Sequence, residues 1–167
     1  MRTFFTLVIV LGIALVLQTA LVSRITLLSG SADLVLVVLA AWALQERVRL
    51  AWLWGVAAGF LVGGVSGAPW FIYLAAYLSV IGIARLLTRR IWQAPLLAMF
   101  AVTFIGTLVL VMFTYVYRIL FEISLPFGEV FVQVILPSVL LNLLLAVAIH
   151  PLMHDIAGRL YPAEVTA

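Results

Sequence analysis

The sequence predicts an all-α, polytopic membrane protein with about six transmembrane helices. Hydrophobic residues make up 67% of the 167-residue chain and charged residues only 9%, against about half and about a quarter in soluble domains. This composition does not supply the charged surface that a water-soluble fold needs. Apolar segments follow one another along the whole chain, so we expect a single integral membrane domain over residues 1–167.

The first apolar segment runs from about Thr3 to Val22, close to the ~20 residues that a membrane span requires. A basic start followed by an apolar run is also typical of a signal peptide. No Ala-x-Ala-like cleavage site follows this run, however. We therefore expect an uncleaved first helix.

The second segment, from about Ser31 to Gln45, is short for a hydrocarbon core of ~30 Å. It follows the stretch RITLLSGSAD, in which residues 25–28 are still largely apolar. If this stretch dips into the membrane interface, the second helix needs less length. Ser31 or Asp33 is the expected N-cap, since either side chain can accept hydrogen bonds from free backbone N–H groups.

The third segment, from about Leu50 to Val65, is also short and carries a regular run of glycines. Gly55, Gly59 and Gly63 recur at every fourth position and so form a small-residue stripe that allows another helix to approach closely. The stripe favours packing within the fold over self-association. The three remaining segments run from about Pro69 to Leu87, Ala94 to Tyr117 and Glu129 to His150.

The sixth segment contains polar residues and prolines in otherwise apolar sequence. Pro137 lacks an N–H group, so a kink is expected there. Ser138 and Asn142 share a helix face, and the Asn142 amide needs partners in hydrocarbon, which a neighbouring helix can provide. An internal tie between helices and a groove for a partner's helix or a small ligand are both open interpretations. Pro151 is expected to end or bend the helix.

The arginines predict the orientation, because cytoplasmic loops collect basic residues. With the N-terminus inside, seven of the nine arginines lie at inner ends and two at outer ends. The inner set is Arg2, Arg47, Arg49, Arg85, Arg89, Arg90 and Arg159, and the outer set is Arg24 and Arg118. Both termini are then expected to face the cytoplasm.

Little in the chain points to catalysis or to a cofactor. All the carboxylates are expected at helix ends or in loops, and cysteine is absent. His150 and His154 have the spacing of half a metal pair, but a helix end that meets water is the simpler interpretation. We predict no catalytic, cofactor or metal residues, and the small net charge of +3 argues against nucleic-acid binding.

Three segments resemble the MreD family of bacterial rod-shape-determining membrane proteins. ILPSVLLNLLLAVAIHPLMHDIAGRL resembles the family's C-terminal signature through Leu136, Pro137, Asn142, Pro151 and Arg159. SADLVLVVLAAWAL resembles its short second helix, with Ala32 where the family usually has proline. GFLVGGVSG resembles its glycine-rich third helix, although the acidic residue that often follows is replaced here near Ser66.

The resemblance implies a non-enzymatic subunit of the cell-elongation machinery in the bacterial cytoplasmic membrane. The implied partner is MreC, a single-span protein, and the MreB filament and a peptidoglycan glycosyltransferase–transpeptidase pair act alongside. Gly55, Gly59, Gly63, Pro137, Ser138, Asn142 and Pro151 are the expected helix-packing or partner-binding residues. The family is also similar in fold to the S components of energy-coupling-factor vitamin transporters. The alternative expectation is therefore a substrate-binding S component.

Overall fold

The computed structural model describes residues 2–46, 48, 50–88, 94–121 and 126–161, and it confirms the all-α fold class. The six main helices are α1 (Arg2–Ala20), α2 (Leu34–Ala43), α3 (Ala51–Val65), α4 (Trp70–Thr88), α5 (Pro95–Phe121) and α7 (Leu136–Leu160). The described residues also form short elements, which include the 3-10 turn η1 (Val22–Arg24), strands β1 (Thr26–Leu27) and β2 (Gly30–Ser31), and helix α6 (Phe127–Val130). A π-helical turn, η2 (Phe131–Ile135), joins α6 to α7.

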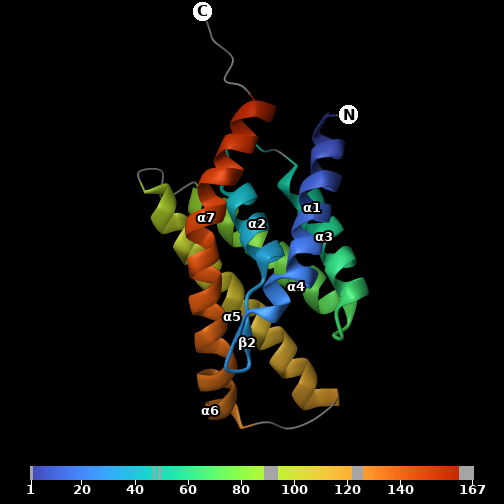
Figure 1. Cartoon of the computed structure of the whole chain (residues 1–167), viewed down its shortest axis with the longest axis vertical. Helices are drawn as coiled ribbons and strands as arrows, with labels where there is room; N and C mark the ends of the chain where they lie inside the picture. The colour runs from blue at the N-terminus through green and yellow to red at the C-terminus, as the bar shows by residue number, and fades with distance from the viewer. Residues whose placement is uncertain (1, 47, 49, 89–93, 122–125, 162–167) are drawn as a thin grey trace, which may run out of the picture.

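The six main helices run in alternating directions, so α1 begins and α7 ends at the same end of the bundle (Figure 1). We call this the terminal end. The β1–β2 hairpin and α6 lie toward the opposite end, which we call the hairpin end (Figure 1). Segments distant in sequence thus meet at each end.

Four helical stretches in the described part of the chain are long and apolar enough to cross a membrane, so the protein is an integral membrane protein. They are Phe5–Arg24, Trp70–Thr88, Pro95–Phe121 and Phe127–Leu160. The expectation of about six full spans was therefore wrong. The second and third apolar segments form α2 and α3, which have 10 and 15 residues and are shorter than the ~20 residues that a span requires.

Helix α2 is short because it lies in the middle of the bundle rather than across the membrane. All ten of its residues are buried, and α1, α4, α5 and α7 pack around it. A helix that is apolar on every side suits such a central position. At its C-terminal end Trp42 packs against Trp54 of α3, with ring centroids 4.3 Å apart and ring planes tilted by 32°, and both side chains are fully buried.

The glycine stripe of α3 packs against α4. A Cβ added at Gly59 would lie 2.6 Å from the Leu74 Cα, and one added at Gly63 would lie 2.5 Å from the Trp70 Cα. A Cβ at Gly55 would overlap the Ile81 side chain. At Gly59 and Gly63 the two helices approach so closely that only glycine fits, whereas at Gly55 the contact is with the end of a side chain that can shift.

Replacing Gly59 with alanine should therefore destabilise the protein by about 1–3 kcal/mol, because the new methyl group meets the α4 backbone and not a flexible side chain. Thermal unfolding in detergent measures the effect. Gly64→Ala is the matched control on the same helix, since nothing lies within 4 Å of its added Cβ. Equal melting temperatures for the two variants would contradict the packing described here.

We expected Pro151 to end or bend the helix, and it does not end it, because α7 continues to Leu160. Proline removes one helical hydrogen bond and disfavours the preceding turn. The turns beyond it are nevertheless held by packing, since Met153 and Ala157 are buried in the core. The ring of Tyr161, just after the helix, lies 6.5 Å from that of Trp42.

Candidate functional site

Pro137 creates a free backbone carbonyl in the wall of the bundle. A residue at position 137 would normally donate its N–H to the carbonyl of Gln133, but proline has no N–H group. The Gln133 carbonyl instead accepts a hydrogen bond of 3.0 Å from the backbone N–H of Ser29. The π-helical turn η2 lies immediately before the proline. A proline in α7 thereby provides an attachment point for the hairpin.

The next two contacts between the hairpin segment and α7 use side chains of α7. The Ser31 N–H donates to the Ser138 Oγ at 3.2 Å, and the Asp33 N–H donates to the Asn142 Oδ1 at 2.7 Å. Both acceptors are buried, with 5% of Ser138 and 1% of Asn142 exposed. Burying these polar side chains without partners would cost free energy. They instead accept hydrogen bonds from backbone N–H groups of the segment that leads into α2.

These three hydrogen bonds form a ladder between an extended segment and a helix. Alternate residues of an extended chain present N–H groups on the same side and are ~6.6 Å apart. The acceptor positions 133, 138 and 142 are separated by five and four helical residues, which correspond to about 7.5 and 6 Å. The spacing of the α7 motif thus matches the repeat of an extended chain that runs in the same direction.

Gly30 allows the close approach that the ladder needs. A Cβ at this position would lie 2.8 Å from each of three atoms: the Pro137 Cβ, the Ser138 backbone N and the Val134 backbone O. Two of these are backbone atoms, one in η2 and one in α7, and cannot move independently. Gly30 is therefore a steric requirement for the contact between hairpin and helix.

Gln18 of α1 holds the other edge of the same segment. Its Nε2 donates to the Ala32 carbonyl at 2.9 Å, and its Oε1 accepts from the Leu34 N–H at 2.7 Å. The chain that enters the bundle is thus bonded to α7 on one edge and to α1 on the other. This double attachment allows backbone without regular secondary structure to lie inside a membrane protein.

Asn142 also ties α7 to α5. Its Nδ2 donates to the Thr107 Oγ1 at 2.9 Å, and the Thr107 hydroxyl donates to the Thr103 carbonyl at 2.7 Å. Both polar ends of the amide therefore have partners. Asn142 joins three parts of the chain: α7, α5 and the N-terminus of α2.

Asp33, one of the two N-caps that the sequence left open, is the N-cap of α2, and its carboxylate lies inside the bundle. The Oδ1 accepts from the Leu36 N–H at 2.9 Å and the Oδ2 from the Tyr77 hydroxyl at 2.8 Å. Asp33 agrees with the expectation that the carboxylates lie at helix ends or in loops. It is at a helix end, but this helix begins inside the bundle.

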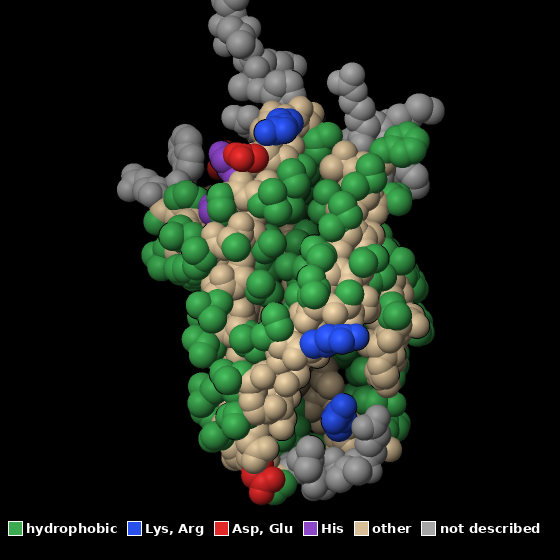
Figure 2. Space-filling model, viewed as in Figure 1, with side chains coloured by type: hydrophobic (Ala, Val, Ile, Leu, Met, Phe, Trp, Pro, Cys, Tyr) green, Lys and Arg blue, Asp and Glu red, His purple; other side chains and the backbone are tan. Residues whose placement is uncertain are grey.

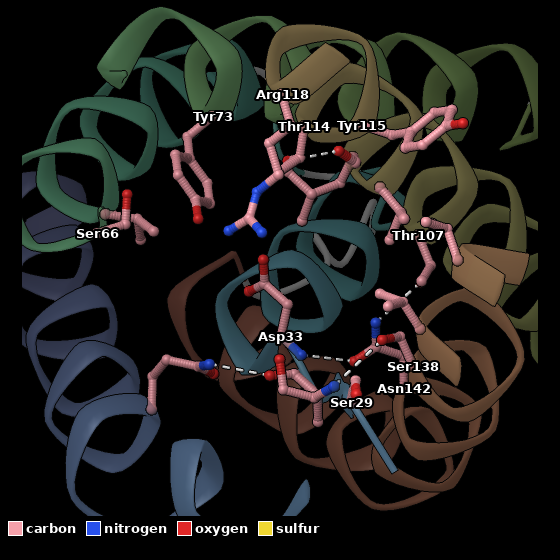
Figure 3. Close-up of a pocket in the computed structure, with 18 of the residues that line it drawn as sticks. Ser29, Asp33, Ser66, Tyr73, Thr107, Thr114, Tyr115, Arg118, Ser138 and Asn142 are labelled. Atoms are coloured by element: carbon pink, nitrogen blue, oxygen red, sulfur yellow. Dashed lines mark hydrogen bonds between the residues drawn. The ribbon is translucent and has the colours of Figure 1, made fainter. Parts of the chain in front are cut away.

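A cavity of about 610 Å³ opens beside Asp33 toward the hairpin end, between α1, α3, α4, α5 and α7. Figure 3 shows the Asp33 carboxylate and the Arg118 guanidinium pointing toward one another across it, with the Tyr73 hydroxyl turned into the same space. Ser138, Asn142 and Thr107 also line it (Figure 3). The ladder therefore forms part of the cavity wall.

The residues that were expected to pack helices together or to bind a partner lie in separate parts of the structure. Pro137, Ser138 and Asn142 belong to the ladder, the three glycines lie at the α3–α4 contact, and Pro151 is exposed on α7 near the terminal end. His154 Nδ1 lies 3.2 Å from the Gln45 Oε1. The described residues contain no group of three or more histidines, cysteines or carboxylates that could hold a metal ion.

Sequence reasoning did not identify Gln18, Gly30, Thr107 or Tyr77 as parts of this arrangement. Of these four residues, Gln18 could have been identified from the sequence. Its side-chain amide lies within the apolar run of the first helix, and such an amide needs a hydrogen-bond partner. Thr103 and Thr107 share a helix face in the same way as Ser138 and Asn142. The pairing between these helices depends on tertiary structure and left no local signal.

In comparisons with known proteins, no family model, no curated protein and no solved structure matches this chain.

Proposed function

We propose that this protein is a non-enzymatic membrane subunit of the bacterial cell-elongation machinery, similar to MreD. It would hold an MreC-type partner in the cytoplasmic (inner) membrane, alongside the MreB filament and the glycosyltransferase–transpeptidase pair that builds peptidoglycan. The proposal rests on the resemblance of three segments, and one structural observation supports it.

That observation is the pairing of two of the three segments. The segment that begins SADL provides Ser31 and Asp33, and the C-terminal segment provides Ser138 and Asn142, and these residues bond directly to each other. The resemblance therefore covers both sides of one contact rather than two unrelated apolar runs. A partly re-entrant hairpin that leads into a short central helix is a specific arrangement, whereas apolar composition alone is common to many membrane proteins.

The surface for the partner helix must lie outside the residues first expected to form it. The glycine stripe is covered by α4, and Ser138 and Asn142 are buried in the ladder. The span that contains α1 is the least covered of the four long spans. In it 17% of the apolar stretch is buried, against 33% to 39% in the others. Gly12 lies in this helix, and nothing lies within 4 Å of a Cβ added there. We assign the partner's transmembrane helix to α1 around Gly12.

Affinity purification from cells that express both proteins tests the function. An MreC-type protein should be recovered in mild detergent, and removal of its transmembrane helix should abolish recovery. Gly12→Phe should reduce recovery without unfolding the chain, whereas Gly64→Phe, at a second open glycine, should not. Unchanged recovery without the partner's transmembrane helix would contradict this mode of binding.

The segment between α5 and α7 is a second proposed contact for the partner's juxtamembrane region. Pro126 and Glu129 lie at the hairpin end and are exposed, whereas Glu122 falls outside the described residues. The partner would thus be held both within the membrane and just outside it.

The proposed orientation places the terminal end in the cytoplasm. Of the arginines with described side chains, Arg85 and Arg159 lie in the last turns of α4 and α7, which run toward the terminal end (Figure 1). Arg24 in η1 and Arg118 in the last turn of α5 follow helices that run toward the hairpin end. The side chains of Arg2, Arg47, Arg49, Arg89 and Arg90 lie outside the described residues. The excess of arginines that the sequence assigns to the terminal end supports this orientation.

The chain contains no cysteine, so single cysteines at Thr3, Ser29, Gln93 and Thr166 can report this orientation. Only the cysteine at Ser29, in the exposed hairpin, should react with an impermeant thiol reagent added to intact cells. Labelling at Thr166 and not at Ser29 would contradict the orientation.

A second candidate function is the substrate-binding S component of a vitamin transporter, and the 610 Å³ cavity favours it. Ligand pockets typically enclose ~300–1,000 Å³ and combine apolar walls with a few convergent polar groups. Equilibrium binding of a vitamin panel to the purified protein separates the two functions. Tight, saturable binding of one vitamin with no MreC-type partner recovered would favour the transporter.

A further inference from the structure

The cavity at the hairpin end opens through the side of the bundle. Figure 2 shows a hollow near this end of the molecule, with basic side chains beside it and hydrophobic side chains over the surface around it. The hollow lies next to the end of α1, which is the least covered long helix. A molecule that lies in the membrane surface can therefore reach it.

Several polar groups in the cavity wall are already used to hold the fold. Gln18 bonds through both polar atoms of its amide to the chain entering the bundle, and Asn142 bonds to Asp33 and Thr107. Ser138 accepts from Ser31. These groups position the wall of the cavity.

The charged groups of the wall have both signs. Asp33 lies at the floor, where its carboxylate accepts from the Leu36 N–H and the Tyr77 hydroxyl and can accept further hydrogen bonds. The guanidinium of Arg118 faces it from α5, beside the Tyr73 hydroxyl (Figure 3). Glu129 is exposed at the mouth. A ligand with a single charge would be attracted to the groups of one sign in this wall and repelled by those of the other sign.

We infer that this cavity binds a zwitterion that carries a primary ammonium group and a phosphate or carboxylate, as the head group of phosphatidylethanolamine does. The ammonium lies on Asp33, since its N–H donors match carboxylate acceptors. The anionic group lies on Arg118, because the planar guanidinium fork binds phosphate or carboxylate through two parallel hydrogen bonds.

The remaining wall of the cavity suits the apolar part of an amphiphile. Leu15, Val62, Leu110, Val111 and Val134 line it together with the charged groups. The glycerol region and the first part of an acyl chain can lie against these side chains, and the rest of the lipid extends into the bilayer. This inference does not depend on the identity of the protein partner, so its failure would leave the proposed function untouched.

Native mass spectrometry of the purified protein with added lipid provides the test. Phosphatidylethanolamine is the probe, and phosphatidylcholine is the matched lipid whose trimethylated nitrogen has no N–H donor. Phosphatidylethanolamine should bind at least about tenfold more tightly, which corresponds to the loss of a charge-assisted hydrogen bond. Free O-phosphoethanolamine, added as a competitor, distinguishes a soluble zwitterion from a lipid.

Two variants localise the binding. Arg118→Gln removes the guanidinium, and Asp33→Asn removes the negative charge but keeps a residue that can cap α2. Each should weaken phosphatidylethanolamine binding about tenfold or more. Arg159→Gln is the control, because Arg159 is exposed in the last turn of α7 at the opposite end of the bundle and does not line the cavity; it should change nothing.

Competition by O-phosphoethanolamine would assign the cavity to a soluble zwitterion, and the absence of competition would assign it to the lipid. Either result, with binding that depends on Arg118, supports the inference. Equal binding of the two lipids, or phosphatidylethanolamine binding that Arg118→Gln leaves unchanged, would overturn it.

Discussion

Gly30→Ala is expected to destabilise the folded protein by about 2–4 kcal/mol. Overpacking typically costs ~1–3 kcal/mol, and here the added methyl would meet the Ser138 backbone N and the Val134 backbone O at 2.8 Å. Moving the hairpin away would relieve this overlap but would weaken the hydrogen bonds of the ladder. Equilibrium unfolding in mixed detergent micelles measures the loss.

Gly128→Ala is the matched control for this substitution. Gly128 lies in α6 at the same end of the bundle, and nothing lies within 4 Å of an added Cβ. Its unfolding midpoint should stay close to that of the parent protein. If Gly30→Ala were as stable as Gly128→Ala, the hairpin could not lie against α7 as described.

Asn142→Leu should cost about 2–4 kcal/mol, since it removes a buried side chain that bonds to both Asp33 and Thr107. An interhelical hydrogen bond in a membrane contributes ~0.6–2 kcal/mol, and the Asp33 N–H left without its partner adds about 1–3 kcal/mol. Asn142→Asp should be worse, because a charge at this depth costs ~2.5–3.5 kcal/mol on insertion scales. Folded yield and detergent unfolding measure both variants.

A double-mutant cycle separates the two bonds of Asn142. Thr107→Val removes the acceptor for the Asn142 Nδ2 and leaves the bond to Asp33 in place. The coupling energy between Asn142→Leu and Thr107→Val should be about 0.6–1.7 kcal/mol. Additive effects, or Leu and Asp variants that accumulate like the parent protein, would show that Asn142 is not a buried tie.

The sequence predicted the fold class because composition alone excludes a water-soluble surface. It also located each main helix, since apolar runs and polar breaks mark where helices begin and end. Asp33 was one of two expected N-caps, because a short acidic residue before an apolar run is a local signal. These successes all depend on neighbouring residues in the chain.

The number of spans could not be predicted in the same way. A buried central helix and a spanning helix are both apolar, and α2 has no polar face that would distinguish them. Its length of ten residues was the clue, but the neighbouring hairpin also carries apolar residues that extend the apparent segment. The position of Asp33 inside the bundle follows from this short helix and was missed for the same reason.

The end of α7 and the cavity were missed because each depends on packing between distant segments. Pro151 is a local signal for a helix end, but Met153 and Ala157 pack against the core and stabilise the turns that follow. The cavity brings together Asp33, Tyr73 and Arg118 from three different elements. No spacing in the sequence predicts that these three residues lie close together.

The central claim is that this chain holds a partner's transmembrane helix against its own exposed helix surface. Photo-crosslinking in cells tests it most directly, with a crosslinking amino acid placed in turn at Ile9, Ile13 and Val16 of α1 and at Leu140, Leu144 and Val147 of α7, all of which are exposed. We expect crosslinks to the transmembrane helix of an MreC-type protein from the α1 positions and few from α7. The absence of any such crosslink from all six positions would contradict the proposed function.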